Sequence, residues 1–409
     1  MLHSRHCQAI FSSIEFLRLS FLRMFPIEDF SGVKTPFYYY DMKLLGETLA
    51  AIKKSLASRP SYKVHYALKA NANGAILDEI AGAGFGADCV SGGEVRAALD
   101  AGIPAEKVVF AGVGKTDDEI RLGLENGIAC FNVESIPELE VINELACEMG
   151  KKAPVAFRVN PNIDAHTHKY ITTGTSENKF GIPMTQIGEV ISLAQTLGNV
   201  EIKGFHFHIG SQLTDMTPYA MLAETVNRML DEWEAKGVMF PTINVGGGLG
   251  IDYNDPDGNP IPDFEGYFKM FDAIKLRDGQ ELHFELGRSV VAQCGSLITR
   301  VIYVKQGVNR KFAIVDAGFT DLIRPALYQA HHNIENLTAE NDAPVDVYDV
   351  VGPICESTDC FARDEKLAEV KRGDLLALRS AGAYGQIMAS QYNLRELPAS
   401  FYDLPGEKN

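Results

Sequence analysis

The sequence predicts an α/β fold in which a (β/α)8 barrel of the TIM type is followed by a mainly β domain. Eight runs rich in β-branched and aromatic residues alternate with helical segments between residues 62 and 287. This alternation is typical of a closed parallel barrel. After residue 288, strand-like runs continue with few helical stretches between them. At 409 residues the chain has room for a barrel of about 250 residues and a second domain.

The eight candidate barrel strands are short apolar runs bounded by turn residues, as expected for buried parallel strands. They are YKVHYALKA (62–70), GADCVS (86–91), KVVFAG (107–112), IACFNV (128–133), PVAFRVN (154–160), EIKGFHFHIG (201–210), TINVGGG (242–248) and ELHFELG (281–287). Segments between them, such as TDDEIRLGLENG, place apolar residues three and four apart and end near glycine, which favours helices.

The runs that predict the second domain are strand-like and closely spaced. They are RVIYVKQ, KFAIVDAG, PVDVYDVVG and DLLALRSAG.

Composition excludes several classes of protein. The formal net charge of -16, without a basic cluster, disfavours nucleic acid as a partner. No span of about 20 uninterrupted apolar residues exists, so we expect no membrane helix. The seven cysteines are scattered and odd in number, which favours a reducing compartment, the cytoplasm, over a disulfide framework.

Residues 1–25 differ from the rest of the chain. The stretch MLHSRHCQAIFSSIEFLRLSFLRMF carries three arginines and one glutamate. Basic, acid-poor termini can be targeting presequences. We favour a dispensable extension, with translation normally starting at Met24.

Polar residues gather at the carboxyl ends of the predicted barrel strands, where barrel enzymes place their chemistry. They are Lys69, Asp88, the histidines of HFH (206–208), Gly246 to Gly248 and Glu285. We expect the Lys69 amine to point into the barrel mouth, where partial burial lowers its pKa towards a nucleophilic free amine.

Three glycines follow the seventh strand in NVGGGLGID (244–252). They allow the backbone to approach an anion and direct N–H groups at it, although a tight turn explains them equally well. Barrel phosphate sites commonly use the loops after strands seven and eight, so we favour phosphate.

The HFH run directs His206 and His208 to one face of a strand. Such a pair can bind a catalytic metal in a barrel hydrolase, and it can equally place a ring against a flat cofactor. Glu285 needs a cationic or proton-donating partner inside a barrel. That partner is Arg288, as a structural ion pair, or a protonated pyridine nitrogen.

A set of motifs in a fixed order makes the interpretation specific. YALKAN, GADCVSGGE, ENKFGI, GFHFHIGS, GGGLG, ELGR, RPALY, GPICESTD and GAYG occur in this order from about residue 35 onwards. The chain thereby resembles the diaminopimelate decarboxylases, which use pyridoxal phosphate and share a barrel with alanine racemase. The resemblance implies a barrel over 42–287 and a β domain made of 26–41, including FYYYD (37–41), together with 288–409.

The resemblance also implies roles for the motif residues in binding pyridoxal 5'-phosphate. Lys69 would hold the cofactor as a Schiff base, His208 would stack on its ring, and Glu285 would keep the ring nitrogen protonated, making the ring an electron sink. The phosphate would be bound by Ser211, by the backbone of Gly246, Gly247, Gly248, Gly287 and Arg288, and by Tyr384. His206 receives no role and is placed behind the site.

The implied reaction is loss of carbon dioxide from meso-2,6-diaminopimelate to give L-lysine, the last step of lysine biosynthesis. Cys355 of CES, from the other subunit of a homodimer with shared active sites, or Lys69 would protonate the carbanion. Recognition of the distal ammonium and carboxylate is implied for Arg288, Arg324, Tyr328, Tyr384 and the partner's Glu356.

Two alternatives stay open at this stage. The first is a related pyridoxal phosphate decarboxylase acting on another basic amino acid, of the ornithine, arginine or carboxynorspermidine type, although Glu rather than Asp after Cys355 favours diaminopimelate. The second is the barrel metal hydrolase using His206 and His208. The chain departs from the family pattern in reading ELGR where EPGR is commoner, and we expect little effect because proline would only stiffen that turn.

Overall fold

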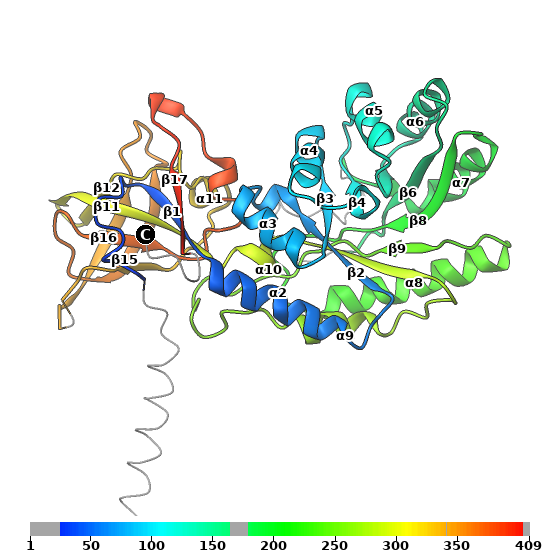
Figure 1. The fold of residues 1–409 in the computed structure, drawn as a ribbon. Helices are drawn as coiled ribbons and strands as arrows, with labels where there is room; N and C mark the ends of the chain where they lie inside the picture. Colours follow the sequence, from blue (N-terminus) through cyan, green and yellow to red (C-terminus); the bar gives the residue numbers. More distant parts are fainter. Residues whose placement is uncertain (1–24, 164–178, 341, 404–409) are drawn as a thin grey trace, which may run out of the picture.

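The computed structural model describes residues 25–163, 179–340 and 342–403, which form two β-sheet structures lying side by side (Figure 1). The predicted extension, apart from Phe25, lies outside the described residues. No helix in the described ranges combines the length and apolarity that a membrane span requires.

Within the described residues, eight parallel strands close into a barrel through the pairing of β5 with β6. The strands are β2 (Tyr62–Ala67), β3 (Gly86–Cys89), β4 (Val108–Phe110), β5 (Cys130–Val133), β6 (Ala153–Asn160), β8 (Val200–His206), β9 (Thr242–Asn244) and β10 (Glu281–Leu286). A two-residue strand, β7 (Ile182–Pro183), adds to β6 outside the ring. Each barrel strand overlaps one predicted run, so the predicted fold class is confirmed.

Amphipathic helices surround the barrel and bury their apolar faces against it (Figure 1). They are α2 (Met42–Leu56), α3 (Gly74–Gly82), α4 (Gly92–Asp100), α5 (Asp117–Asn126), α6 (Ile136–Glu148), α7 (Ile187–Thr196), α8 (Thr217–Ala235) and α9 (Phe264–Phe271). Helix α5 shows why these segments fold as helices: Thr116 and Glu119 form a capping box, and Gly127 ends the helix at φ 65°. Ile120 and Leu124 form its buried stripe.

The second sheet contains β1 (Phe37–Asp41) and the strands after the barrel. These are β11 (Gly295–Gln306), β12 (Lys311–Val315), β13 (Ile334–Asn336), β14 (Val345–Val351), β15 (Cys360–Ala368), β16 (Leu375–Leu378) and β17 (Ala399–Asp403). Strand β1 pairs antiparallel with β11 and parallel with β17. Two short helices, α10 (Arg288–Val291) and α11 (Arg324–Tyr328), lie at the carboxyl end of β10 and before β13.

We propose the domain division that the sequence suggested, with residues 42–287 as the barrel and 26–41 with 288–409 as the β domain. The strand pairings support it, because β1 pairs only within the second sheet among the described strands.

Asn71 connects the two parts of the fold. Its side chain is 2% exposed, and its Nδ2 donates both to the Tyr40 hydroxyl of β1 and to the Gly382 carbonyl, each at 2.9 Å. Its Oδ1 accepts from the Asn73 N–H. One side chain thereby bonds the loop after β2 to the β domain.

Replacing Asn71 with alanine leaves the Gly382 carbonyl and the Asn73 N–H without their partner. An unsatisfied buried polar group costs about 1–3 kcal/mol, so we expect Asn71→Ala to lower the free energy of unfolding by about 2–3 kcal/mol in urea titrations. Asn126→Ala is the matched control, since that exposed amide bonds only within α5, and it should change stability by less than about 0.5 kcal/mol. Equal effects of the two substitutions would contradict the assignment of Asn71 as a connector.

Candidate active site

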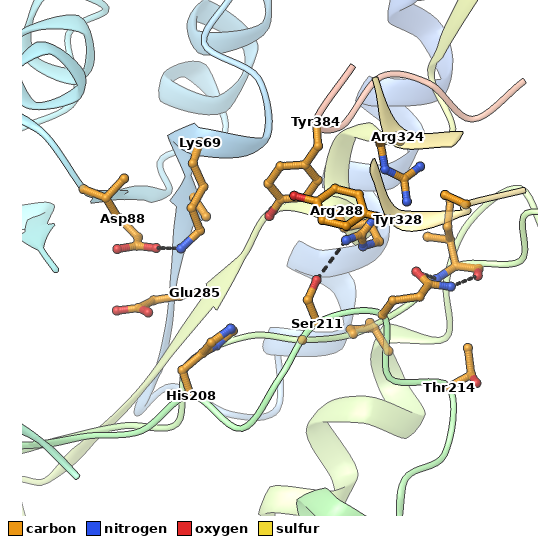
Figure 2. A pocket seen from close by; sticks show the side chains of 18 of the residues that line it. Lys69, Asp88, His208, Ser211, Thr214, Glu285, Arg288, Arg324, Tyr328 and Tyr384 are labelled. Carbon is orange, nitrogen blue, oxygen red and sulfur yellow. Dashed lines mark hydrogen bonds and ion pairs between the residues drawn. The ribbon is translucent and has the colours of Figure 1, made fainter. Parts of the chain in front are cut away.

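A cavity of about 970 Å³ opens at the carboxyl ends of the barrel strands and is lined by both parts of the fold (Figure 2). It brings together most of the site residues that the sequence suggested. These are Lys69, His208, Ser211, Gly248, Glu285, Gly287, Arg288, Arg324, Tyr328 and Tyr384. The volume lies within the range of small-molecule sites in proteins.

Lys69 lies on the turn Leu68–Ala70 directly after β2, and its Nζ is 3.5 Å from Asp88 Oδ2. The expectation of a lowered pKa is wrong. Burial alone lowers the pKa of this amine, but the charge of Asp88, with Tyr384 and Glu285 adding to it, outweighs burial and raises the pKa above its ordinary value. The amine is therefore an ammonium in this structure, and it must lose a proton before it can act as a nucleophile.

Asp88, at the end of β3, is fully buried, and its Oδ1 has no hydrogen-bond partner among the residues that the structure describes. Burial raises the pKa of this carboxyl, and the nearby charge of Glu285 adds to the effect, while Lys69 opposes it. The carboxyl group next to Lys69 therefore binds a proton more tightly than an ordinary aspartate does.

Glu285, on β10, is held by donors from three other barrel strands. Asn132 Nδ2 and Asn244 Nδ2 donate to Oε1 at 3.2 and 2.7 Å, and His206 Nε2 donates to Oε2 at 2.9 Å. Burial alone raises the pKa of this carboxyl, but the His206 charge and hydrogen bond, aided by Lys69, shift the net pKa below the ordinary value. Glu285 is an ionised carboxylate at the base of the cavity.

His206 borders the cavity together with Glu285, to which it is bonded, so the expectation that it lies behind the site is not met. His206 is 1% exposed, whereas His208 is partly exposed to the cavity. The Gly247 N–H donates to His208 Nδ1 at 3.3 Å, which orients the ring. Burial, together with the positive charges of Lys69 and Arg158, lowers the pKa of His208 well below its ordinary value, so the ring is neutral.

The three glycines after β9 are required by close packing of neighbouring loops. A Cβ on Gly246, which has φ +71°, would lie 2.3 Å from the Phe207 carbonyl oxygen. One on Gly248, at φ +109°, would lie 2.6 Å from the Gly210 carbonyl oxygen. The tight-turn interpretation of this segment is therefore sufficient for the fold, and a phosphate role is an additional proposal.

Arg288 and Arg324 form a cationic wall opposite Lys69 (Figure 2). Arg288 donates to Ser211 Oγ at 2.9 Å and to the Tyr253 hydroxyl at 2.7 Å, so the possible ion pair between Arg288 and Glu285 is not formed. Arg324 is 5% exposed and bonds to His332. In the described ranges the hydrogen bonds of both guanidinium groups go to hydroxyl and imidazole groups and not to a carboxylate, which leaves their charge available to an anionic ligand.

Cys355 and Glu356 lie outside the cavity of their own chain and are exposed. The Cys355 N–H donates to Asn393 Oδ1 at 3.1 Å, and the Tyr392 hydroxyl donates to Glu356 Oε1 at 3.0 Å. These two predicted site residues are thus held away from Lys69 in a single chain.

Among the cavity-lining residues that sequence reasoning missed, Arg158 and Tyr253 contact charged groups of the site. Arg158, near the end of β6, donates to Glu134 Oε1 at 2.8 Å, and its position at a predicted strand end could have identified it. Tyr253, in the loop after the glycines, contacts both arginines of the wall, and no sequence pattern marks it.

The metal-hydrolase alternative has no support in the described residues. They contain no group of three or more histidine, cysteine, aspartate or glutamate side chains arranged to hold a metal ion. His206 and His208 do not form a pair of metal ligands, because Nε2 of His206 bonds to Glu285.

Comparisons with known proteins agree with this geometry. Residues 43–292 match the family described as pyridoxal-dependent decarboxylase, pyridoxal binding domain. The chain is 61% identical over 379 residues to the diaminopimelate decarboxylase of Bacteroides thetaiotaomicron, covering 92% of this chain and 98% of that protein. The chain belongs to the diaminopimelate decarboxylase family.

Solved structures extend the similarity to the fold. The diaminopimelate decarboxylase of Helicobacter pylori complexed with L-lysine is 41% identical with a TM-score of 0.86, covering 92% of this chain and 93% of that one. That of M. jannaschii, also in complex with L-lysine, is 37% identical with a TM-score of 0.85, covering 92% and 89%. A lysine/ornithine decarboxylase from Vibrio vulnificus, at 21% identity and a TM-score of 0.79 with 92% and 96% covered, shares the fold.

The raised pKa of Asp88 predicts a pH-dependent loss of stability in the cofactor-free protein. The folded state binds this proton more tightly than the unfolded chain, in which an aspartate has a pKa near about 4. The stabilisation is complete below that pH and is lost as the pH rises through the folded-state pKa. Asp88→Asn removes this titration, so its stability relative to the unsubstituted protein should rise above about pH 5.

Urea unfolding of both proteins at several pH values between about 4 and 8 checks this expectation. A stability difference that does not vary with pH would contradict the raised pKa.

Proposed function

We propose that the protein uses pyridoxal 5'-phosphate to decarboxylate meso-2,6-diaminopimelate to L-lysine and carbon dioxide. The observation that carries the proposal is the division of one cavity into two parts. Lys69 lies beside Asp88 and Glu285 on one side, and on the other lie two guanidinium groups that pair with no carboxylate of the described residues. An amino acid with a carboxylate at each end suits this arrangement.

The residues present fit pyridoxal phosphate by their chemistry. Lys69 supplies a primary amine, Glu285 a buried carboxylate that stays ionised, and His208 a neutral flat ring. Within the described part of the chain, the buried Asp88 Oδ1 and Arg288 Nε have no hydrogen-bond partner. When bound, this cofactor supplies an electron-withdrawing ring that accepts the electron pair left by carbon dioxide.

Each side chain has a defined task in holding such a group. Lys69 would attach to its aldehyde carbon, and Glu285 would hold a proton on the ring nitrogen, since an ionised carboxylate fixed by three donors cannot easily be neutralised. His208 would pack against the ring face. Ser211, the backbone of Gly246 to Gly248, Gly287 and Arg288, and Tyr384 would surround the phosphate.

The raised pKa of Lys69 implies a proton transfer before substrate chemistry. Asp88 is the carboxylate paired with that ammonium, at 3.5 Å, and its ionised form would lie within reach of the proton. We therefore add Asp88 to the proposed catalytic residues as a proton acceptor for Lys69.

The far end of the substrate would bind to the cationic wall. Arg324 and Arg288, with Tyr328 and Tyr384, would receive the distal carboxylate, because charge-assisted bonds from guanidinium to carboxylate are strong and planar. The partner subunit's Glu356 would receive the distal ammonium.

We infer a homodimer with shared active sites. Cys355 and Glu356 are exposed and lie outside their own cavity. The segment that bonds to them through Tyr392 and Asn393 continues into exposed apolar side chains, Leu394 at 97% and Leu397 at 54% exposure, as expected for a surface covered by a second copy. A proton would then return to the substrate carbon from Cys355 of the partner subunit or from the Lys69 that lines the cavity.

Carbon dioxide release from meso-diaminopimelate, L-ornithine, L-arginine and L-lysine, measured side by side with added pyridoxal phosphate, tests the proposal. We expect release from meso-diaminopimelate with L-lysine as product, at a rate at least about 100-fold above the other substrates, since each lacks a group that the cavity is built to bind. Lys69→Ala is the control and should abolish both the activity and the visible absorbance of bound cofactor. Preferred release from ornithine or arginine would overturn the substrate and retain the cofactor.

A further inference from the structure

Among residues 25–163, 179–340 and 342–403, Arg324 is held in place without a carboxylate partner. Its side chain is 5% exposed, and its Nη1 donates to His332 Nε2 at 2.8 Å. The guanidinium carbon lies 4.7 Å from the centre of the Tyr253 ring. A buried arginine normally pairs with a carboxylate. Here its partners are an imidazole and an aromatic face.

The hydrogen bonds of His332 fix its tautomer. The side chain is 2% exposed, and Nδ1 lies 2.8 Å from the Arg379 carbonyl oxygen. A carbonyl only accepts, so Nδ1 carries the proton and Nε2 presents the lone pair that accepts from Arg324. His332 is thus a fixed, neutral acceptor.

The charge state of His332 agrees with these contacts. Burial, with the positive charge of Arg324 adding to it, lowers the pKa of His332 to about 3. The imidazole therefore accepts a hydrogen bond from one N–H group of Arg324 and does not neutralise the positive charge of the guanidinium. An aspartate or glutamate at this position would orient the guanidinium equally well and neutralise it.

Tyr253 connects the two arginines of the wall. Its hydroxyl accepts from Arg288 Nη1 at 2.7 Å, while its ring faces Arg324. The ring also packs edge-on against His332, with centroids 5.2 Å apart and an interplanar angle of 78°. Figure 2 shows Arg288 and Arg324 on the same side of the cavity. Tyr253 and His332 therefore hold two positively charged guanidinium groups close to each other. Burial, and in addition the positive charge of Arg288, lowers the pKa of Arg324.

We propose that Tyr253 and His332 are positioning residues that orient Arg324 and Arg288, without neutralising them, to select a substrate carrying a distal carboxylate. A guanidinium already fixed in its binding orientation loses little rotamer freedom when the ligand arrives. The identity of that ligand rests on the proposed function, while the contacts that fix Arg324 do not.

The test compares two ligands that differ by one carboxylate. L-lysine retains the carboxylate at the end distal to decarboxylation, and 1,5-diaminopentane lacks it. Titration calorimetry on the cofactor-loaded protein measures the dissociation constant of each. His332→Phe removes the acceptor, and His332→Gln keeps a carbonyl oxygen that can accept from Arg324.

We expect His332→Phe to weaken L-lysine binding about tenfold and to change diamine binding less than about twofold, since one charge-assisted contact loses its alignment. His332→Gln should lie within about threefold of the unsubstituted protein. Tyr253→Phe removes only the hydroxyl and should weaken L-lysine selectively by about threefold, whereas the exposed Tyr303→Phe should change neither ligand.

Several outcomes would overturn the proposal. Equal weakening of both ligands would indicate general damage to the cavity, and no weakening in either His332→Phe or Tyr253→Phe would show that Arg324 and Arg288 need no positioning. Should His332→Phe fail to fold, the selective effect of Tyr253→Phe decides by itself. Absence of L-lysine binding to the unsubstituted protein, a separate observation, would defeat the proposed function and this inference with it.

Discussion

The structure depends on keeping one carboxylate ionised inside a barrel. Glu285 lies at the end of β10, and its oxygens are bonded by Asn132 from β5, His206 from β8 and Asn244 from β9. An unpaired buried charge would cost several kcal/mol or be protonated. Only a closed ring of strands brings these donors around β10. Closure of the barrel is therefore what gives the cavity a fixed negative charge at its base.

The remaining charges follow from that arrangement. The charges of Asp88 and Glu285 raise the pKa of Lys69, while burial and the charge of Glu285 raise the pKa of Asp88. The opposite wall carries Arg288 and Arg324, oriented by Tyr253 and His332. The cavity therefore separates a place for chemistry on an amine from a place for binding a carboxylate. A substrate that carries an amine and a carboxylate at each end can react in the first part while its distal carboxylate binds in the second.

The sequence predicted the barrel well because its strands are buried on both faces and appear as short apolar runs between helical segments. It missed β15 because four consecutive residues of CFARDEKLA are charged and obscure the alternation. Strand β13, of three residues, is too short to give a pattern. The site residues at strand ends, from Lys69 to Glu285, could be found because the barrel fixes where strand ends meet.

Properties that depend on distances between segments could not be read from the sequence. The raised pKa of Lys69 arises from Asp88 and Glu285, which come from different strands, so a prediction from burial alone had the wrong sign. The same holds for Tyr253 and His332, which are 79 residues apart in the chain and lie next to Arg324 only in the folded protein. Each looks ordinary in its local segment.

The most direct test of the central claim, that one cavity separates the chemical and the carboxylate-binding ends, is a crystal structure grown with pyridoxal phosphate and L-lysine. We predict the cofactor ring between His208 and the Lys69 side, its nitrogen at Glu285, and the lysine carboxylate on Arg324. The partner's Cys355 and Glu356 should complete the opening of the cavity. A lysine carboxylate bound away from Arg324, or a ring nitrogen directed away from Glu285, would contradict the account.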